Sequence, residues 1–336
     1  MSSGLLVVVM VVAVALVFDY INGFHDTANA IATVVSTGVL PIRTAVLIAA
    51  ALNFGGAFLG TAVASTIGKG ILLPADVTQV VVLSALLGAI FWNLFTWYFG
   101  IPSSSSHALI GGLIGAGAAR SGSAAIQTAG VTKVVKSLVL SPIIGFVIAF
   151  AVMIAIFWAI RRLRPAKLNI AFRRLQMVSA GLMALSHGSN DAQKTMGIIT
   201  MSLVAYGAVR GDGDKFAVPV WVVFACALAM ALGTAAGGVR IIKTMGTKII
   251  DLKPVHGFAA ETSAAITILT SSAFGLPVST THVITGCIMG AGASQRVSAV
   301  RWGVTTRILW AWLLTIPVSA VVSAVCYLGA SRLFGS

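Results

Sequence analysis

The chain has 336 residues, of which 58% are hydrophobic and only 9% are Asp, Glu, Lys or Arg. A soluble domain carries about a quarter charged residues, so a water-soluble fold would lack the polar surface that it needs. The formal net charge is +14. The basic residues lie between apolar stretches and no base-reading or stacking module accompanies them, which excludes nucleic acid as a partner. We therefore expect the lipid bilayer to surround the chain.

Apolar blocks recur along the whole chain. They are Leu5–Phe18, Thr44–Ala64, Val80–Tyr98, Leu138–Ile160, Val218–Gly233, Thr262–Phe274 and Ile308–Leu328, with shorter Gly-rich blocks between them. No cleavage site follows the first block, which we interpret as a span rather than a signal peptide. The pattern predicts an all-α polytopic membrane protein with roughly 9 to 12 membrane segments.

Two stretches of the chain resemble each other, which indicates an internal duplication. Pro102-Ser-Ser-Ser-Ser-His107 resembles Pro277-Val-Ser-Thr-Thr-His282, and the match continues at one constant offset, without a gap, to Pro142 and Pro317. A duplicated chain is expected to fold as two related halves.

A second pair of motifs precedes the first in each half. Gly23-Phe-His-Asp26 resembles Gly188-Ser-Asn-Asp191, so both motifs occur in the same order in each half. We therefore divide the chain into a first repeat, 1–160, a basic linker, 161–174, and a second repeat, 175–336.

The basic residues indicate how the two repeats are oriented. The linker contains no acid and six basic residues, Arg161, Arg162, Arg164, Lys167, Arg173 and Arg174, whereas residues 1–42 contain no Lys or Arg. Cytoplasmic loops are enriched in Lys and Arg, so we expect a cytoplasmic linker and repeats that begin on opposite sides of the membrane. Two copies in opposite orientation are typical of inverted-repeat transporters.

Two acids stand at equivalent places of the repeats, beside apolar stretches. Asp26 and Asp191 have mostly amide and basic neighbours in sequence, which are Asn22, His25, Asn29, Asn190, Gln193 and Lys194. A carboxylate at the centre of a membrane helix costs roughly 2.5 to 3.5 kcal/mol, so it needs a partner or a function. Carboxylate and amide oxygens suit a small hard cation or a proton, and helix capping at the membrane surface is the alternative. Gly23 and Gly188 predict that each helix breaks there and lines a cavity.

Hydroxyl-rich stretches follow the two repeated prolines. Pro102 and Pro277 each end an apolar segment, and a run of hydroxyl residues then opens a Gly-rich helix. The N-terminus of a helix presents free N–H groups and a partial positive charge, which suit an oxyanion. Ordinary N-capping of two helices is the simpler interpretation.

Three further residues have two interpretations each. Glu261 lies in an apolar segment where the first repeat carries Leu86, and it either binds a cation or has a structural role. His107 and His282 either carry protons or are hydrogen-bonding helix residues.

With these residues the chain resembles the inorganic phosphate transporter (PiT) family. Asn22–Ala30 is similar to the first family motif and His187–Thr195 to the second, and both Pro-Ser/Thr-His stretches match. The resemblance covers nearly the whole chain. It implies secondary active transport of phosphate at a site between the repeats, formed by the two Asp motifs and two re-entrant hairpins. It also implies a homodimer in the plasma (inner) membrane of a prokaryote.

The motifs and the resemblance together give the expected site residues. We expect the phosphate site to consist of Ser104, Ser105, Ser106, Ser279, Thr280, Thr281, Asn29 and Asn190. The coupling ion is expected at Asp26, Asp191, His25 and Glu261. No enzymatic cofactor is expected.

One position bears on the coupling ion. The first motif carries His25 where sodium-coupled members of the family have Asn. The form with His resembles the bacterial low-affinity branch, which implies proton coupling and a divalent metal that travels with phosphate. Sodium held by Asp26 and Asp191 is the alternative.

Other functions are less consistent with the residues. Sulfate is an alternative cargo, although phosphate can still donate a hydrogen bond to Asp26 or Asp191. A Ser–His hydrolase is disfavoured because Ser106 and His107 are adjacent in sequence, which is poor geometry for a nucleophile and its base. A passive channel is the remaining alternative.

Overall fold

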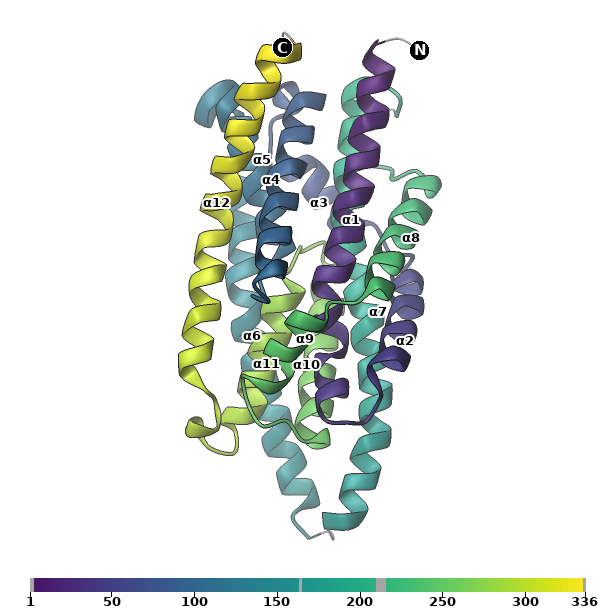
Figure 1. The fold of residues 1–336 in the computed structure, drawn as a ribbon, viewed down its shortest axis with the longest axis vertical. Coiled ribbons are helices and arrows are strands. Elements are labelled where there is room, and N and C mark those ends of the chain that lie inside the picture. Colours follow the sequence, from purple (N-terminus) through teal and green to yellow (C-terminus); the bar gives the residue numbers. More distant parts are fainter. Residues whose placement is uncertain (1–2, 163–164, 210–215, 335–336) are drawn as a thin grey trace.

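The computed structural model describes residues 3–162, 165–209 and 216–334, and within them the chain forms twelve α-helices (Figure 1). They are α1 (Ser3–Ser36), α2 (Ile42–Gly56), α3 (Ala62–Gly70), α4 (Gln79–Tyr98), α5 (Ser105–Ser121), α6 (Thr128–Ile160), α7 (Pro165–Tyr206), α8 (Val220–Ala236), α9 (Val239–Thr247), α10 (Pro254–Ala273), α11 (Thr280–Ala293) and α12 (Trp302–Phe334). These residues contain no β-strand, only one isolated bridge between Leu72 and Ile126. The predicted all-α fold is confirmed.

Four helices among the described residues are long and apolar enough to cross a membrane alone. They are Gly4–Ser36, Gln79–Tyr98, Thr128–Ile160 and Trp302–Arg332, and Val220–Ala236 with Arg240–Thr247 adds a fifth if this bent pair is one span. The other helices are shorter or, like the 42-residue α7, interrupted by polar residues. Such segments are tolerated at membrane depth where protein surrounds them. The chain is therefore an integral membrane protein.

The two halves of the chain present the same series of helices. α3 and α9 each have 9 residues, α4 and α10 each have 20, and α6 and α12 each have 33. In Figure 1, α1 runs from the upper to the lower end, whereas α7 runs from the lower to the upper end. The first helix of each half therefore runs in the opposite direction to the other.

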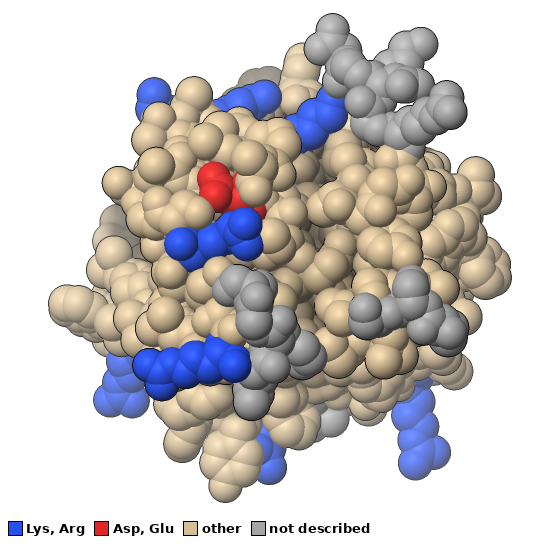
Figure 2. Space-filling model, turned by 90° about the horizontal axis from the view of Figure 1, so that it is seen from above, with Lys and Arg blue, Asp and Glu red and all other residues tan. Residues whose placement is uncertain are grey.

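The two ends of the bundle contain different parts of the chain. Both termini lie at the upper end, and α6 and α7 meet at the lower end (Figure 1). Viewed from the upper end, Lys and Arg side chains are scattered over a mostly uncharged surface, and one of them lies beside an acidic side chain (Figure 2). α7 begins at Pro165, so residues 165–174 of the predicted linker are helical, while Leu163 and Arg164 lie outside the described residues.

Two helical hairpins meet inside the bundle. α4 and α5 lie in the upper half and α10 and α11 in the lower half (Figure 1). Their tips touch, because the hydroxyl of Ser106 donates a hydrogen bond of 3.2 Å to the carbonyl of Val278. The ring centroids of His107 and His282 are 4.5 Å apart. α5 and α11 therefore both begin in the interior, close to each other.

Glycines allow close helix packing rather than helix breaks. α1 and α7 are continuous through Gly23 and Gly188, so the predicted breaks are wrong. A Cβ atom on Gly23 would lie 2.5 Å from the carbonyl oxygen of Met230 in α8, and one on Gly188 would collide with the backbone of Asn53 in α2. The backbone hydrogen bonds stay within each helix, and the missing side chains let α8 and α2 approach the two Asp motifs.

Two adjacent glycines of α2 provide a test of this packing. A Cβ on Gly56 would collide with the carbonyl of Leu185 in α7, whereas one on Gly55 would meet nothing within 4 Å. We expect Gly56→Ala to destabilise the protein by about 1–3 kcal/mol, the usual cost of overpacking. Gly55→Ala should leave stability unchanged or raise it by up to about 1 kcal/mol through helix propensity. Thermal unfolding in detergent measures both, and equal melting temperatures for the two variants would contradict the packing argument.

Candidate functional site

Asp26 of α1 and Asp191 of α7 lie side by side in the interior. One oxygen of each carboxylate and one imidazole nitrogen of His187 all lie within 4.8 Å of one another. Asp26 is 2% exposed and Asp191 is 1% exposed. Two carboxylates this close repel each other strongly where water is excluded, so neighbouring groups must offset their charge.

Asp26 is linked to both hairpins. Its Oδ1 lies 2.6 Å from Nδ1 of His25, whose Nε2 lies 3.0 Å from the hydroxyl of Thr96 at the end of α4. The hydroxyls of Ser105 in α5 and Thr281 in α11 each donate to the carboxylate over 3.5 Å. Both hydroxyl contacts are long, so Asp26 has only weak donors apart from His25.

Asp191 has closer partners. Lys194 forms an ion pair with Oδ1, and Nε2 of His187 lies 3.2 Å from Oδ2. The hydroxyl of Thr280 donates to Oδ2 over 3.0 Å. The ammonium of Lys194 also donates to the carbonyl of Val278, over 2.9 Å. Asp191 is thus held by nitrogen groups of its own helix and by the tip of the second hairpin.

Two of the predicted phosphate-binding hydroxyls cap helices. Ser104 accepts a hydrogen bond from the backbone N–H of His107, and Ser279 accepts one from that of His282, both over 3.2 Å. These side chains fix the helix N-termini at the centre, as N-caps do.

The other hydroxyls divide into two groups. Ser106 donates to the carbonyl of Val278 and so joins the two hairpin tips. Ser105, Thr280 and Thr281 reach the two carboxylates. Hydroxyls from both hairpins and two helix N-termini therefore surround the pair of aspartates, and a hydroxyl can donate to an anion as readily as to a carboxylate.

The two predicted asparagines are buried beside the hairpins. The amide of Asn29 donates to Thr280 over 3.2 Å and to Thr281 over 2.9 Å, and that of Asn190 donates to Ser272 over 2.7 Å. The side-chain carbonyl oxygen of each has no hydrogen-bond partner among the described residues. Each asparagine therefore offers one open acceptor in the interior.

Glu261 lies apart from the carboxylate pair. Its oxygens accept hydrogen bonds from Thr33 over 2.5 Å, from Gln176 over 3.0 Å, and from Ser179. Thr33 stands seven residues beyond Asp26, which is about 10 Å along a helix. No ion pair of Glu261 occurs within the described part of the chain, and neutral donors of α1 and α7 bind this carboxylate of α10.

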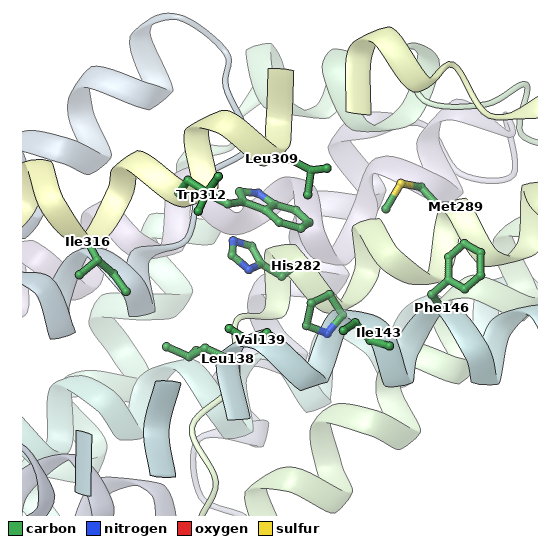
Figure 3. Close-up of a pocket in the computed structure, with 11 residues that line it drawn as sticks. Leu138, Val139, Ile143, Phe146, His282, Met289, Leu309, Trp312 and Ile316 are labelled. Carbon is green, nitrogen blue, oxygen red and sulfur yellow. The ribbon is translucent and has the colours of Figure 1, made fainter. Parts of the chain in front are cut away.

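His282 lies between the hairpin tips and an apolar cavity (Figure 3). Its ring stacks on Trp312 with a centroid distance of 3.7 Å, and the indole N–H donates to the carbonyl of Pro102 over 3.1 Å. The cavity has a volume of about 640 Å³ and lies between α6, α11 and α12. Its other lining residues are Leu138, Val139, Pro142, Ile143, Phe146, Met289, Leu309, Leu313 and Ile316. This apolar lining cannot bind an anion, so the cavity is not a phosphate site.

Three polar residues of the interior were not predicted as site residues. His187 and Lys194 stand four residues before and three residues after Asp191, a helical spacing that could have revealed them. Asp19 is fully buried in α1, where Thr195 donates to one of its oxygens over 3.0 Å and the other oxygen has no partner among the described residues. An acid directly after the first apolar block, within the same helix, was the signal for this residue.

These features define a class of protein. Buried charged residues at the meeting point of two hairpins, in a bundle of membrane helices that run in opposite directions, are typical of secondary transport proteins. The chain belongs to the phosphate transporter family, whose model matches residues 22–170 and 161–323. It is a family of transporters, not of enzymes.

Relatives in bacteria cover nearly the entire chain. A protein of Rhizobium meliloti (strain 1021), named "Probable low-affinity inorganic phosphate transporter", is 52% identical over 320 residues, 95% of each chain. A protein of Bacillus subtilis (strain 168) with the same name is 49% identical over 336 residues, 99% of this chain and 100% of the relative. The predicted resemblance to the low-affinity bacterial branch is confirmed.

A solved structure has the same fold. "The sodium-dependent phosphate transporter" matches with a TM-score of 0.87 and 26% sequence identity, over 97% of this chain and 99% of that one. The helical arrangement is therefore shared almost from end to end.

The two aspartates should differ in their effect on stability. Asp191→Asn leaves the ammonium of Lys194 buried without its carboxylate, a change that costs about 3–5 kcal/mol. Asp26→Asn keeps an acceptor for Ser105 and Thr281 and removes the repulsion between the carboxylates. We expect a much larger fall in melting temperature for Asp191→Asn, measured in detergent at neutral pH. A larger fall for Asp26→Asn would show that the buried ammonium of Lys194 does not need the carboxylate of Asp191 to offset its charge.

Proposed function

We propose that the protein is a symporter that carries inorganic phosphate together with a coupling cation by alternating access. One observation carries the proposal: two hairpin tips bring their hydroxyls and helix N-termini to the same buried pair of carboxylates. The N-termini and hydroxyls suit an oxyanion, and the carboxylates suit a cation.

Charge balance explains why the two ions travel together. Phosphate alone would add negative charge beside Asp26 and Asp191 where little water screens it. A cation that binds at the same time offsets this repulsion. Near neutral pH phosphate retains a proton that it can donate to a carboxylate, whereas sulfate has none, so the acceptor-rich site favours phosphate over sulfate.

The two hairpins provide a mechanism for alternating access. They approach the site from opposite halves of the bundle (Figure 1). The repeats 1–160 and 175–336 are the two units that move relative to each other, and the site lies between them. Movement at one hairpin opens the site to one side while the other hairpin keeps it closed.

Orientation and assembly complete the proposal. The junction of α6 and α7 carries Arg161, Arg162, Arg173 and Arg174, and this basic cluster supports a lower end that faces the cytoplasm of a prokaryote. The protein acts in the plasma (inner) membrane as a homodimer, and phosphate travels either free or as a complex with a divalent metal.

Proton coupling is our proposal for the cation. His25 lies next to Asp26 and bridges it to Thr96 at the end of α4. An imidazole can accept and release a proton, so His25 can pass one to or from the carboxylate. Sodium is the second candidate, because the solved structure with this fold is named a sodium-dependent transporter.

Uptake of radiolabelled phosphate into proteoliposomes tests the function. We expect phosphate to accumulate against its gradient when a proton gradient is imposed without sodium. Asp26→Asn should abolish accumulation, because it removes the carboxylate that accepts the coupling cation. Excess unlabelled sulfate should compete weakly.

Three different results of the uptake experiment would each overturn part of the proposal. Accumulation driven only by sodium would replace the proton by sodium as the coupling cation. Equal uptake with and without any gradient would indicate a passive channel. Sulfate uptake without phosphate uptake would change the cargo.

His25→Asn separates coupling from binding. This variant keeps a hydrogen-bonding side chain and loses the titratable group. We expect proton-driven accumulation to fall by roughly 5- to 150-fold, the range of a coupling free energy of 1–3 kcal/mol. Exchange of internal for external phosphate without a gradient should continue. Unchanged accumulation would show that His25 does not take part in proton coupling.

A further inference from the structure

The two Asp motifs differ at the positions that flank the carboxylate. Asp26 has Asn22 four residues before it and Asn29 three residues after it, and both spacings place these residues on the same helix face. The equivalent neighbours of Asp191 are His187 and Lys194. The first half therefore carries two amides where the second half carries two nitrogen bases.

The first half presents open oxygen atoms. Asn22 and Asn29 are each 1% exposed, and the side-chain carbonyl oxygen of each has no hydrogen-bond partner among the described residues. The carboxylate of Asp26 receives only the 3.5 Å contacts of Ser105 and Thr281 besides its contact with His25. Buried acceptors without donors are uncommon because they lose hydration without compensation. A carboxylate among them attracts a cation or a proton.

The second half has its charge compensated by the chain itself. Lys194, which is 3% exposed, forms an ion pair with Asp191 and donates to the carbonyl of Val278 at the hairpin tip. His187 approaches the other carboxylate oxygen to 3.2 Å. Asp191 thus has a positive partner at the place where Asp26 has an amide and no fixed cation.

We propose that Lys194 is a tethered cation that takes the place of one coupling cation beside Asp191. This inference rests on the proposed function. With the ammonium of Lys194 in that position, the two Asp motifs retain one position for an exchangeable cation. Asp26 and the open oxygens of Asn22 and Asn29 form it. A proton on Asp26 can donate to one of these oxygens, and sodium can bind to all three groups.

The same arrangement gives Lys194 a part in the movement of the second hairpin. Its ammonium contacts α7 through Asp191 and the hairpin tip through Val278, whose carbonyl also accepts from Ser106 of the first hairpin. A free cation would leave this position in each cycle, whereas a tethered one stays. The second half therefore requires no ion from solution to hold its hairpin tip near Asp191.

Lys194→Asn tests the proposal, because it gives the second motif the residue of the first. We measure phosphate binding to the purified protein as a function of sodium concentration and, separately, of pH. The slope of the logarithm of the dissociation constant against the logarithm of the cation concentration counts the cations bound with phosphate. This slope is negative, and we expect it to become more negative by about one in Lys194→Asn, because a free cation replaces the ammonium. The same slope as in the wild type would overturn the proposal.

Two further variants keep the test decisive. Lys133→Asn makes the same substitution at an exposed position of α6 and should leave the slope unchanged. Asp191→Asn with Lys194→Asn removes the whole ion pair, so it should fold even if Lys194→Asn alone does not, and it should keep the wild-type slope. A double variant that fails to fold, or that needs an additional cation, would overturn the proposal.

The experiments distinguish a failure of the Lys194 proposal from a failure of the proposed function. If the wild-type protein neither binds nor accumulates phosphate, the proposed function fails. If the wild type transports phosphate and the slope of Lys194→Asn does not change, only the role of Lys194 fails.

Discussion

Two buried carboxylates within reach of each other impose the main constraint on this structure. Asp26 and Asp191 come from helices far apart in the sequence, and little water surrounds them. Their mutual repulsion has to be offset by groups that the fold brings to the same place. The hairpin tips, with their hydroxyls and helix N-termini, and the ammonium of Lys194 provide that compensation. The position of both hairpins is thus tied to the charge of the site.

The two halves have similar helices and different chemistry. The N-caps Ser104 and Ser279 make the same contact at the same distance, and the helices that follow them begin at the same place. The side chains around the carboxylates differ, because one half has Asn29 where the other has Lys194. Glu261 is a further difference, since the first repeat carries Leu86 at its position. A symmetric frame can therefore hold a site with unequal charges in its two halves.

The repeated motifs predicted much of this arrangement, while the contacts between distant segments could not be predicted. The Pro-Ser/Thr-His stretches predicted two helix N-termini, because N-capping depends on local sequence. The same local reasoning failed at Gly23, where the reason for glycine is the backbone of α8 rather than a break in α1. Thr96 carried no signal, because its role depends on a contact with His25 that is 71 positions away in sequence. A single sequence therefore predicts helix faces and caps, but it does not predict which helix packs against each face.

The shared use of the hydroxyls links phosphate binding to cation binding. Ser105, Thr280 and Thr281 donate to the carboxylates. A hydroxyl has one proton to donate, so a group that turns to phosphate no longer stabilises a carboxylate. Asp191 keeps Lys194 when this happens, but Asp26 loses its weak donors and retains only His25. In the proposed cycle, phosphate therefore raises the affinity of Asp26 for a proton or a sodium ion, and by reciprocity the cation raises the affinity for phosphate. Coupling then follows from a limited number of hydrogen-bond donors at the meeting point of the hairpins.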